Sequence, residues 1–464
     1  MKLKNLEKKN PAPTPLFREK AGWYGARILI LGFGKEGRDN FLFFRKIFPK
    51  KVLGIGDRQE ISNFKFQISN LLRKDKYVKL HLGKDYLKAI KNYDIVVKSP
   101  GIPIHLPEIE KAYKEGKITS QTQIFFENCP GKIIGVTGTK GKSTTTALIY
   151  RVLKTGGFKV HLVGNIGNPV LNFLLSATKK DIYVYELSSH QLYNLKKSPQ
   201  IAVFLNLFPE HLDYYQNFNE YLRAKQNITR YQKKEDYFIF NPKNEKVKAT
   251  AKITKAKKIP IKTEIVKKFV KSKDIPLIGN FYFLNIAAAI EIGKLFKIQK
   301  EKIKKAIKDF KPLKHRLELV GTFKGITFYN DSLSTIPETT ILALDSLGDK
   351  VQTIFLGGSD RGLDFKNLAK RILKSGIKTL ILFPTTGDKI WKEIVSLKKN
   401  HKLKAIVVQN MRDGVKLAYQ YTKKGKICLL SCASPSFSLF KDYKEKGNLF
   451  KKYVREYGQS KKSS

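Results

Sequence analysis

Residues 132–146, KIIGVTGTKGKSTTT, form the stretch from which the fold of this chain can be inferred. The apolar run from Ile133 to Val136 predicts a buried strand, and the segment ALIYRVLK that follows the threonines predicts a helix. Between them, Gly138 and Gly141 allow the backbone to curl so that several N–H groups face one anion, which the positive end of the helix also attracts. The stretch therefore predicts a phosphate-binding loop in an α/β domain.

The carboxyl end of this loop predicts an ATP site. Lys142 supplies a mobile charge for the terminal phosphates, and Ser143 supplies a hydroxyl group for Mg²⁺. The spacing departs from the usual pattern, because the position of its first glycine is Val136 here, one residue after Gly135. We expect ATP to be bound by the loop residues Gly138, Thr139, Lys140, Gly141, Lys142, Ser143 and Thr144.

The length and composition of the chain indicate a globular protein of several domains. For 464 residues we expect two to four domains, and 42% apolar and 11% aromatic residues are typical of folded chains. The net charge of +51 is typical of nucleic-acid-binding proteins. The lysines, however, are spread along the whole chain instead of forming one basic arm, so we favour a lysine-biased composition without a nucleic-acid partner.

The cysteines and the apolar segments indicate a soluble cytoplasmic protein. Cys129, Cys428 and Cys432 form no metal-like or disulfide framework, which suits a reducing compartment. The N-terminal segment MKLKNLEKKNPAPTPLF has no apolar stretch of the kind found in signal peptides. No apolar run approaches the roughly 18 residues that a membrane-spanning helix needs.

The first part of the chain has the pattern of a Rossmann-type βαβ unit. A strand from Ile28 to Leu31 leads into a turn that contains Gly34 and Gly37, and the next strand ends at Asp57. Such glycines permit a tight turn beneath a pyrophosphate, and an acid about 20 residues later reaches a ribose or a base. An NAD-type cofactor is the alternative ligand for this turn.

Polar or glycine-containing turns follow later strands, at the edge where ligands of parallel sheets bind. Ser99-Pro100-Gly101 follows the apolar run 95–97, and we expect it to face the same ligand as the first turn. Glu186 follows the run 182–185, where its carboxylate can hold Mg²⁺ beside the loop hydroxyl group. Near the C-terminus, NDS at 330–332 and GGSDRG at 357–362 also follow apolar runs, and we expect them to face a ligand.

Three further polar side chains belong to segments between the predicted strands. His211 and Asp213 are expected in a loop, and Lys225 is expected on a helix. Taken one at a time, such residues are more often ordinary surface groups than functional ones.

Motifs along nearly the whole chain, in one order, resemble those of the Mur ligase family. They are GVTGTKGKST at 135–144, GNIG at 164–167, ELSSHQL at 186–192, PEHLDYY at 209–215, LRAK at 222–225, HRLE at 315–318, NDSLST at 330–335, GGSDRGLDF at 357–365 and ASPSFSLFKDYKEKG at 433–447. The resemblance implies an α/β protein of three domains. These are a UDP-binding Rossmann-like domain (1–119), a central P-loop ATPase domain with a mostly parallel sheet (120–313) and a C-terminal Rossmann-like domain that binds an amino acid (314–464). It also accounts for the loop spacing, since Mur ligases use this version of the loop.

The resemblance implies a role for each residue that matches a family motif. The expected catalytic or metal-binding side chains are Lys142, Ser143, Glu186, His211 and Lys225, the last as a carbamate that offers Mg²⁺ an anionic oxygen. Beyond the loop, ATP is expected to contact Asn285, Arg316 and Asp331. The expected contacts of the UDP-linked substrate are Gly34, Gly37, Asp57, Arg58, Ser99, Gly101 and Asn165. Those of the amino acid are Thr335, Arg361, Ser436, Phe437 and Tyr443.

Several positions depart from the family pattern. The His-Asn pair of the family motif near Asn285 is Phe281-Tyr282 here, which changes the expected adenine contacts, and the lysine often found after Asp-Ser is Leu333. Arg361 stands where lysine is frequent and adds a bidentate fork for a carboxylate. In the first glycine turn, Lys35 and Glu36 replace smaller or neutral residues, which changes the expected UDP contacts.

The activity implied by the resemblance is the ATP-dependent joining of D-glutamate to UDP-N-acetylmuramoyl-L-alanine through an acyl phosphate, a step of peptidoglycan precursor synthesis. ATP and Mg²⁺ are the expected cofactors, the two small molecules are the expected partners, and a monomer is the expected state. A related ligase that uses L-glutamate or another amino acid is one alternative, and a basic nucleic-acid-binding P-loop NTPase is another. A dinucleotide-dependent oxidoreductase is disfavoured because it leaves the loop at 132–146 unexplained.

Overall fold

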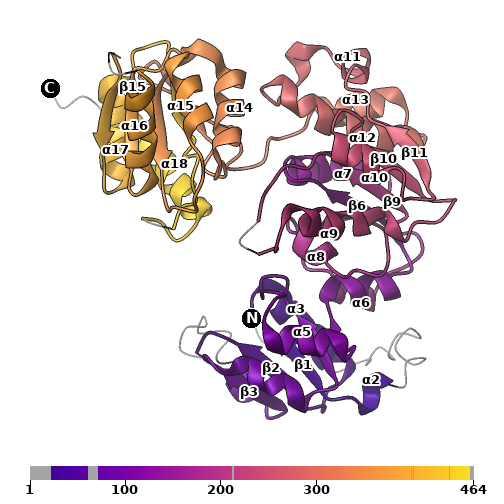
Figure 1. Cartoon of the computed structure of the whole chain (residues 1–464). Helices are drawn as coiled ribbons and strands as arrows, with labels where there is room; N and C mark the ends of the chain where they lie inside the picture. The colour runs from indigo at the N-terminus through magenta and orange to yellow at the C-terminus, as the bar shows by residue number, and fades with distance from the viewer. Residues whose placement is uncertain are drawn as a thin grey trace. The chain divides into compact units, whose positions relative to one another are not determined.

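The computed structural model describes residues 22–60, 70, 72–211, 214–398, 400, 402–437 and 439–459, which form two compact α/β units (Figure 1). Unit 1 consists of Met1–Phe269 with Leu284–Ala306, and unit 2 consists of Val270–Phe283 with Ile307–Ser464. Among the described residues there are three sheets, two of them in unit 1, so the α/β fold expected from the sequence is confirmed. The domain boundaries after residues 119 and 313 stay predictions.

The first sheet carries the N-terminal glycine turn at its carboxyl edge. Its strand order is β3-β2-β1-β4-β5, and every neighbouring pair is parallel. Ile28 and Ile30 pack into one core cluster and Leu29 and Leu31 into another, because β1 is buried on both faces. The strands are β1 (Ile28–Leu31), β2 (Leu53–Asp57), β3 (Val78–Leu82), β4 (Ile95–Lys98) and β5 (Ile118–Thr119), and the helices are α2 (Gly22–Gly25), α3 (Lys35–Ile47), the 3-10 helix η2 (Tyr86–Asn92) and α5 (Pro107–Lys114).

The second sheet, in the middle of unit 1, carries the phosphate loop. Its order is β11-β10-β9-β6-β8-β7, and all pairs are parallel. The strands are β6 (Lys132–Thr137), β7 (Val160–Gly164), β8 (Ile182–Glu186), β9 (Ile201–Phe204), β10 (Tyr237–Phe240) and β11 (Lys257–Pro260). The helices are α6 (Gln121–Asn128), α7 (Lys142–Thr155), η3 (Leu171–Leu175), α8 (Ser189–Leu192), α9 (Phe218–Arg230), α10 (Glu245–Thr250), α11 (Ile265–Phe269), α12 (Phe283–Leu295) and α13 (Lys300–Lys308). The register pairs Val136 with Glu186, which brings the end of β8 beside the start of the loop.

The third sheet forms the core of unit 2. Its order is β12-β13-β17-β14-β15-β16, and only the β12–β13 pair is antiparallel among these strands. The two residues between β12 and β13, Lys324 and Gly325, have φ of 50° and 78°, as a tight hairpin turn requires. The strands are β12 (Glu318–Phe323), β13 (Ile326–Asn330), β14 (Val351–Gly357), β15 (Thr379–Phe383), β16 (Lys404–Val407) and β17 (Ile427–Leu430).

Helices cover both faces of this third sheet. Ile354 and Leu356 of β14 pack with α14, α15 and α16, whereas Phe355 packs on the other face with α17 and α18. The helical segments of unit 2 are η4 (Ser272–Asp274), η5 (Asn280–Tyr282), α14 (Pro337–Leu347), η6 (Gly348–Lys350), α15 (Lys366–Leu373), α16 (Thr386–Leu397), α17 (Met411–Tyr421) and α18 (Tyr443–Gln459). No helix of the described residues is both long and apolar enough to span a membrane.

Within unit 1, polar side chains of helix α3 form hydrogen bonds with the helices that flank the second sheet. Asp39 accepts hydrogen bonds from Gln121 Nε2 at 3.1 Å and Asn172 Nδ2 at 2.5 Å. Glu36 accepts one from Gln191 Nε2 at 2.7 Å. Burial raises the pKa of Glu36 to about 7. The unusual Glu36 of the first glycine turn therefore contacts the segment that follows β8.

A histidine between two carboxylates makes a second connection of the same kind. His105 lies 3.1 Å from Glu110 through Nδ1 and 3.0 Å from Glu220 of α9 through Nε2. Glu220 also accepts hydrogen bonds from Tyr193 Oη and Gln216 N. Burial opposes the charged imidazole, but the hydrogen bonds with both carboxylates outweigh it and raise the pKa of His105. This cluster attaches the loop before α5 to the helix that carries Lys225.

Candidate active site

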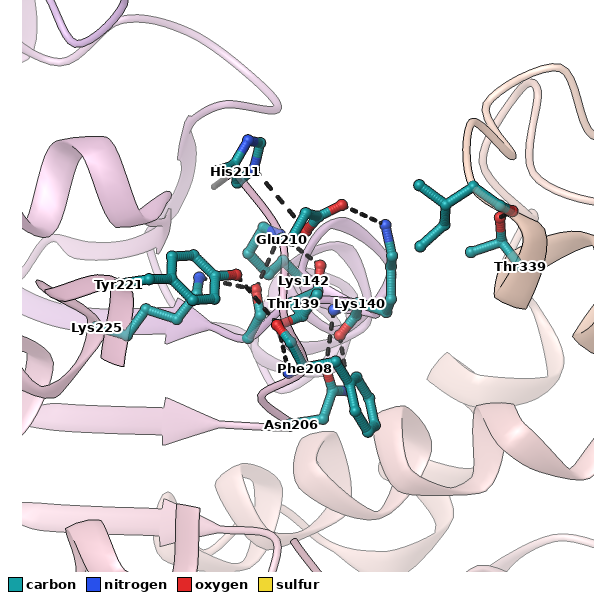
Figure 2. Close-up of polar contacts among 12 residues, drawn as sticks. Thr139, Lys140, Lys142, Asn206, Phe208, Glu210, His211, Tyr221, Lys225 and Thr339 are labelled. Atoms are coloured by element: carbon teal, nitrogen blue, oxygen red, sulfur yellow. Dashed lines mark hydrogen bonds and ion pairs between the residues drawn. The ribbon is translucent and has the colours of Figure 1, made fainter. Parts of the chain in front are cut away.

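The phosphate loop has the backbone that an anion site requires. Gly138 and Gly141 have φ of 154° and 85°, and α7 begins directly after Gly141, at Lys142. A β-carbon at Gly141 would lie 2.7 Å from Asn285 Oδ1, so both the backbone angle and the space demand glycine. Lys142 Nζ donates to the carbonyl oxygens of Gly138 at 2.9 Å and Thr139 at 3.0 Å, which folds its side chain over the loop (Figure 2).

Two side chains that sequence reasoning missed contact Lys140 of the phosphate loop. Glu210 forms an ion pair with Lys140 at 2.7 Å, and Asn206 Oδ1 accepts the Lys140 N–H at 2.8 Å (Figure 2). Burial raises the pKa of Glu210, but the ammonium groups of Lys140 and Lys142 lower it overall. Glu210 directly precedes His211 in the PEHLDYY motif, which is a signal that could have found it, whereas Asn206 follows β9 without any recognisable motif.

Ser143 and Glu186 form the part of the site that fits a divalent cation. Ser143 Oγ donates to Glu186 Oε1 at 3.1 Å, and Glu186 is 3% exposed. The second carboxylate oxygen, Oε2, is buried and has no hydrogen-bond partner in the described part of the chain. That part also holds no cluster of three or more His, Cys, Asp or Glu side chains that could bind a metal. The arrangement fits Mg²⁺, which commonly uses one or two carboxylates and completes its shell with phosphate oxygens and water.

Lys225 lies beneath the loop and is almost fully buried. It is 1% exposed, its Nζ donates to Gly138 O at 3.0 Å, and it lies 5.0 Å from the Tyr221 ring centroid. Burial, and then the charge of Lys142, lowers the pKa of Lys225 well below its ordinary value. An amine held in its neutral form is the species that reacts with CO₂ to give a carbamate, which agrees with the role inferred for Lys225.

His211 approaches the same place on a strained backbone. Its φ is 59°, a left-handed value that is uncommon for a residue with a side chain and that recurs at functional sites. Its Nε2 lies 3.8 Å from Glu210 Oε2. Asp213, which the sequence places in the same loop, lies outside the described residues.

One cavity of about 260 Å³ brings together predicted residues from both sheets of unit 1. Gly101 comes from the turn after β4, and Asn165 follows β7, whereas Lys142, His211 and Lys225 come from around the phosphate loop. The remaining lining residues are Pro100, Ser188, Ser189, His190 and Tyr221. The cavity therefore joins a predicted substrate-binding turn to the predicted phosphate and metal residues.

The predicted UDP contacts of the first sheet form one turn at the carboxyl ends of β1 and β2. Asp57 accepts the N–H of Phe33 at 2.5 Å and that of Gln59 at 2.8 Å, so its carboxylate fixes the glycine turn. Ser99 Oγ donates to Gly32 O at 2.8 Å. Gly34 caps α3, Gly37 is buried against the turn, and Arg58 is exposed. The structure thus assigns Asp57 a local structural task, and its contact with uracil stays a prediction.

The predicted amino-acid contacts all belong to unit 2. The Arg361 guanidinium lies 5.9 Å from the Phe437 ring centroid, and Phe437 is 62% exposed. Ser436 Oγ is buried without a hydrogen-bond partner among the described residues, and Tyr443 begins α18. Thr335 is half-buried in the turn after β13. The Arg361 guanidinium and the Ser436 hydroxyl group are therefore available to a ligand of unit 2.

Two predicted ATP contacts, Arg316 and Asp331, also lie in unit 2. Asp331 accepts hydrogen bonds from Ser334 Oγ at 2.5 Å, Ser431 Oγ at 2.9 Å and Leu317 N at 3.0 Å. Burial raises the pKa of Asp331 to about 6. Its carboxylate thus fixes the turn after β13 through hydrogen bonds within unit 2. A contact of Asp331 with ATP stays a prediction.

Two solved structures share this fold. The chain has 18% sequence identity and a TM-score of 0.57 to UDP-N-acetylmuramate–alanine ligase MurC from Thermotoga maritima, over 94% of this chain and 100% of that one. It has 13% identity and a TM-score of 0.57 to the MurF ligase from Thermotoga maritima in complex with ADP, over 94% and 97% of the two chains.

Sequence comparison identifies the family. The profile of the Mur ligase middle domain matches residues 136–293, which include the phosphate loop, Glu186, His211 and Lys225. The UDP-N-acetylmuramoylalanine–D-glutamate ligase of Acetivibrio thermocellus is 35% identical over 81% of this chain and 86% of its own length. The enzyme of the same name from Koribacter versatilis is 32% identical over 94% of this chain and 99% of its own length. The chain therefore belongs to the Mur ligase family, in the group of the UDP-N-acetylmuramoylalanine–D-glutamate ligases.

Proposed function

We propose that this chain is the ATP-dependent ligase that joins D-glutamate to UDP-N-acetylmuramoyl-L-alanine in peptidoglycan precursor synthesis. The observation that carries the proposal is the cavity in which Lys142, His211 and Lys225 meet Gly101 and Asn165. A substrate carboxylate in this cavity lies beside the loop that holds the terminal phosphates of ATP. The names of the full-length relatives support the same substrates.

The chemistry begins with activation of the substrate carboxylate. A carboxylate does not accept an amine near neutral pH because its leaving group would be oxide. Transfer of the γ-phosphoryl group of ATP to a carboxylate oxygen forms an acyl phosphate and releases ADP. Lys142 and the backbone N–H groups of the loop offset the charge of the transferred group. The loop thus positions the phosphates instead of attacking them.

Ser143 and Glu186 are the residues that hold Mg²⁺ in this proposal, together with the phosphate oxygens. The support is the buried Glu186 Oε2, which lacks a hydrogen-bond partner in the described chain, beside the Ser143 hydroxyl group. When bound, Mg²⁺ neutralises charge on the phosphoryl group. Lys225 as a carbamate and His211 complete the metal-facing side of the cavity.

The amine of glutamate then attacks the carbonyl carbon of the acyl phosphate. The tetrahedral intermediate collapses with loss of inorganic phosphate and forms the amide bond. We assign the binding of glutamate to Thr335, Arg361, Ser436, Phe437 and Tyr443 of unit 2. The arginine fork supports this assignment, because it suits a carboxylate. The monomeric state and the cytoplasmic location stay predictions from the sequence.

The deciding experiment measures phosphate release and product mass. We expect phosphate only when ATP, Mg²⁺, UDP-N-acetylmuramoyl-L-alanine and D-glutamate are all present, with a product whose mass increases by one glutamate residue. Phosphate release that is indifferent to the muramoyl substrate would refute the proposal. A product formed with L-glutamate alone would show that the chain is the related ligase that uses L-glutamate. This second candidate is retained because Leu333, in the turn after β13, stands where the family often has lysine. ATP hydrolysis that depends on DNA or RNA would instead support the nucleic-acid-binding NTPase.

A further inference from the structure

His190 is a cavity residue that none of the predicted roles uses. It lies in the first turn of α8, four residues after Glu186, and lines the cavity together with Gly101, Asn165 and Lys142. Its ring nitrogens make no hydrogen bond to any described residue. An imidazole without a partner, at the wall of a polar cavity, leaves an N–H group available to a ligand.

Neighbouring rings fix the orientation of this imidazole. The Tyr214 ring packs edge-on against it, with centroids 4.1 Å apart and planes at 79°. The centroid of His211 lies 4.9 Å away and that of Tyr215 lies 5.7 Å away. Tyr214 Oη in turn donates to Pro100 O at 3.1 Å, and Pro100 belongs to the substrate-facing turn that also lines the cavity. The ring is therefore held in place before any ligand arrives.

The charges around His190 favour an anionic ligand. Lys142 lines the cavity, and Lys98 lies behind the turn after β4, where its Nζ donates to Ile102 O at 2.7 Å. The imidazole of His190 adds an N–H donor to this part of the cavity.

We propose that His190 binds the substrate: its ring N–H donates to an oxygen of the L-alanyl carboxylate of the UDP-linked substrate, and so places that carboxylate beside the phosphate loop. This rests on the proposed function. The carboxylate is favoured over the γ-phosphate because Tyr214, which packs against the His190 ring, also donates to Pro100 O in the substrate-facing turn, whereas Lys142 contacts the phosphate loop. His190 is thus assigned to the acceptor substrate and not to ATP.

The test replaces His190 in two ways. His190→Phe keeps an aromatic ring against Tyr214 and removes the N–H donor, whereas His190→Asn keeps a donor in a smaller side chain. Binding is measured by calorimetry with UDP-N-acetylmuramoyl-L-alanine and with its alaninamide analogue, which lacks only the negative charge of the alanyl carboxylate. We expect His190→Phe to weaken binding of the acid about 10- to 100-fold, as for loss of one hydrogen bond to a charged group. We expect little change for the amide, an unchanged KM for ATP, and partial recovery with Asn.

A matched control is His161→Phe on β7. His161 stacks on Tyr183 and pairs with Asp181 outside the cavity, so its replacement should leave both substrate affinities unchanged. Melting temperatures of all variants show whether a loss of binding reflects unfolding. If His190→Phe is unfolded, the affinity of His190→Asn for the acid tests the inference. Equal binding of the acid by wild type and both variants overturns the inference, and so does an equal loss for acid and amide or a loss confined to ATP. Wild-type protein that fails to bind the acid at all would instead refute the proposed function.

Discussion

Replacing Glu186 by glutamine tests the metal site through binding and not through activity alone. In the protein without ligands, Glu186 is 3% exposed and its Oε2 has no partner among the described residues. An unsatisfied buried oxygen costs about 1–3 kcal/mol. Glu186→Gln removes the buried charge, so we expect the free energy of unfolding of the unliganded protein to stay the same or rise, by up to about 1–3 kcal/mol.

The same substitution should weaken Mg²⁺-dependent binding of ADP. At a MgADP concentration 100 times Kd, the wild type gains about 2.7 kcal/mol, which corresponds to about 5–10 °C in Tm for a domain of this size. Losing one charged contact costs about 1.5–3 kcal/mol of binding, or about 10- to 100-fold. At the same MgADP concentration, the variant then gains only about 0.4–1.4 kcal/mol.

The assay is thermal unfolding with ADP and either Mg²⁺ or EDTA, at one fixed nucleotide concentration. Glu291→Gln on α12 is the control, because Glu291 is 8% exposed and pairs with Lys294 at 3.0 Å, away from the loop. We expect the control to keep the wild-type difference between Mg²⁺ and EDTA, and Glu186→Gln to lose most of it. A Glu186→Gln protein with the full wild-type difference would refute the assignment of Glu186 as a metal ligand.

Three further predictions concern the loop, the buried lysine and the contact at His105. Gly141→Ala should cost about 1–2 kcal/mol of stability, because φ is 85° and the new β-carbon meets Asn285, and calorimetry should show weaker ADP binding; wild-type affinity would contradict this. Lys225→Ala should lower ligase activity about 100-fold or more, and CO₂-free wild type should regain activity when bicarbonate is added; indifference to bicarbonate argues against a carbamate. The pKa of His105 is raised in the folded state. The charged imidazole therefore stabilises the folded protein below the pKa of the unfolded state, near 6.5, and this stabilisation is lost as the pH rises through the folded-state pKa. Glu220→Gln should therefore destabilise the protein by about 1 kcal/mol at pH 6 and by less at pH 8, as urea unfolding would show; an equal effect at both pH values would count against the ion pair.

Much of the fold could be predicted because its signals are local. The apolar runs at 28–31, 95–97, 133–136 and 182–185 all lie in strands, since short continuous apolar runs between polar turns are typical of buried parallel strands. The loop at 138–144 also follows from local sequence, because glycines with positive φ and a helix N-terminus determine how its N–H groups point. The antiparallel strand β12 was not anticipated, although the hairpin at Lys324-Gly325 explains it.

The sequence by itself determined which residue types carry the chemistry, and only the tertiary structure decided which of them meet. Ser143 and Glu186 are 43 positions apart, and they come within 3.1 Å because the register of β6 and β8 places Val136 opposite Glu186. The burial of Lys225, the Lys140–Glu210 pair and the unpartnered ring of His190 likewise depend on crossovers between strands. Sequence spacing carries no information on such distances, because in a parallel sheet the order of the strands, not the length of the chain between them, determines which strand ends lie side by side.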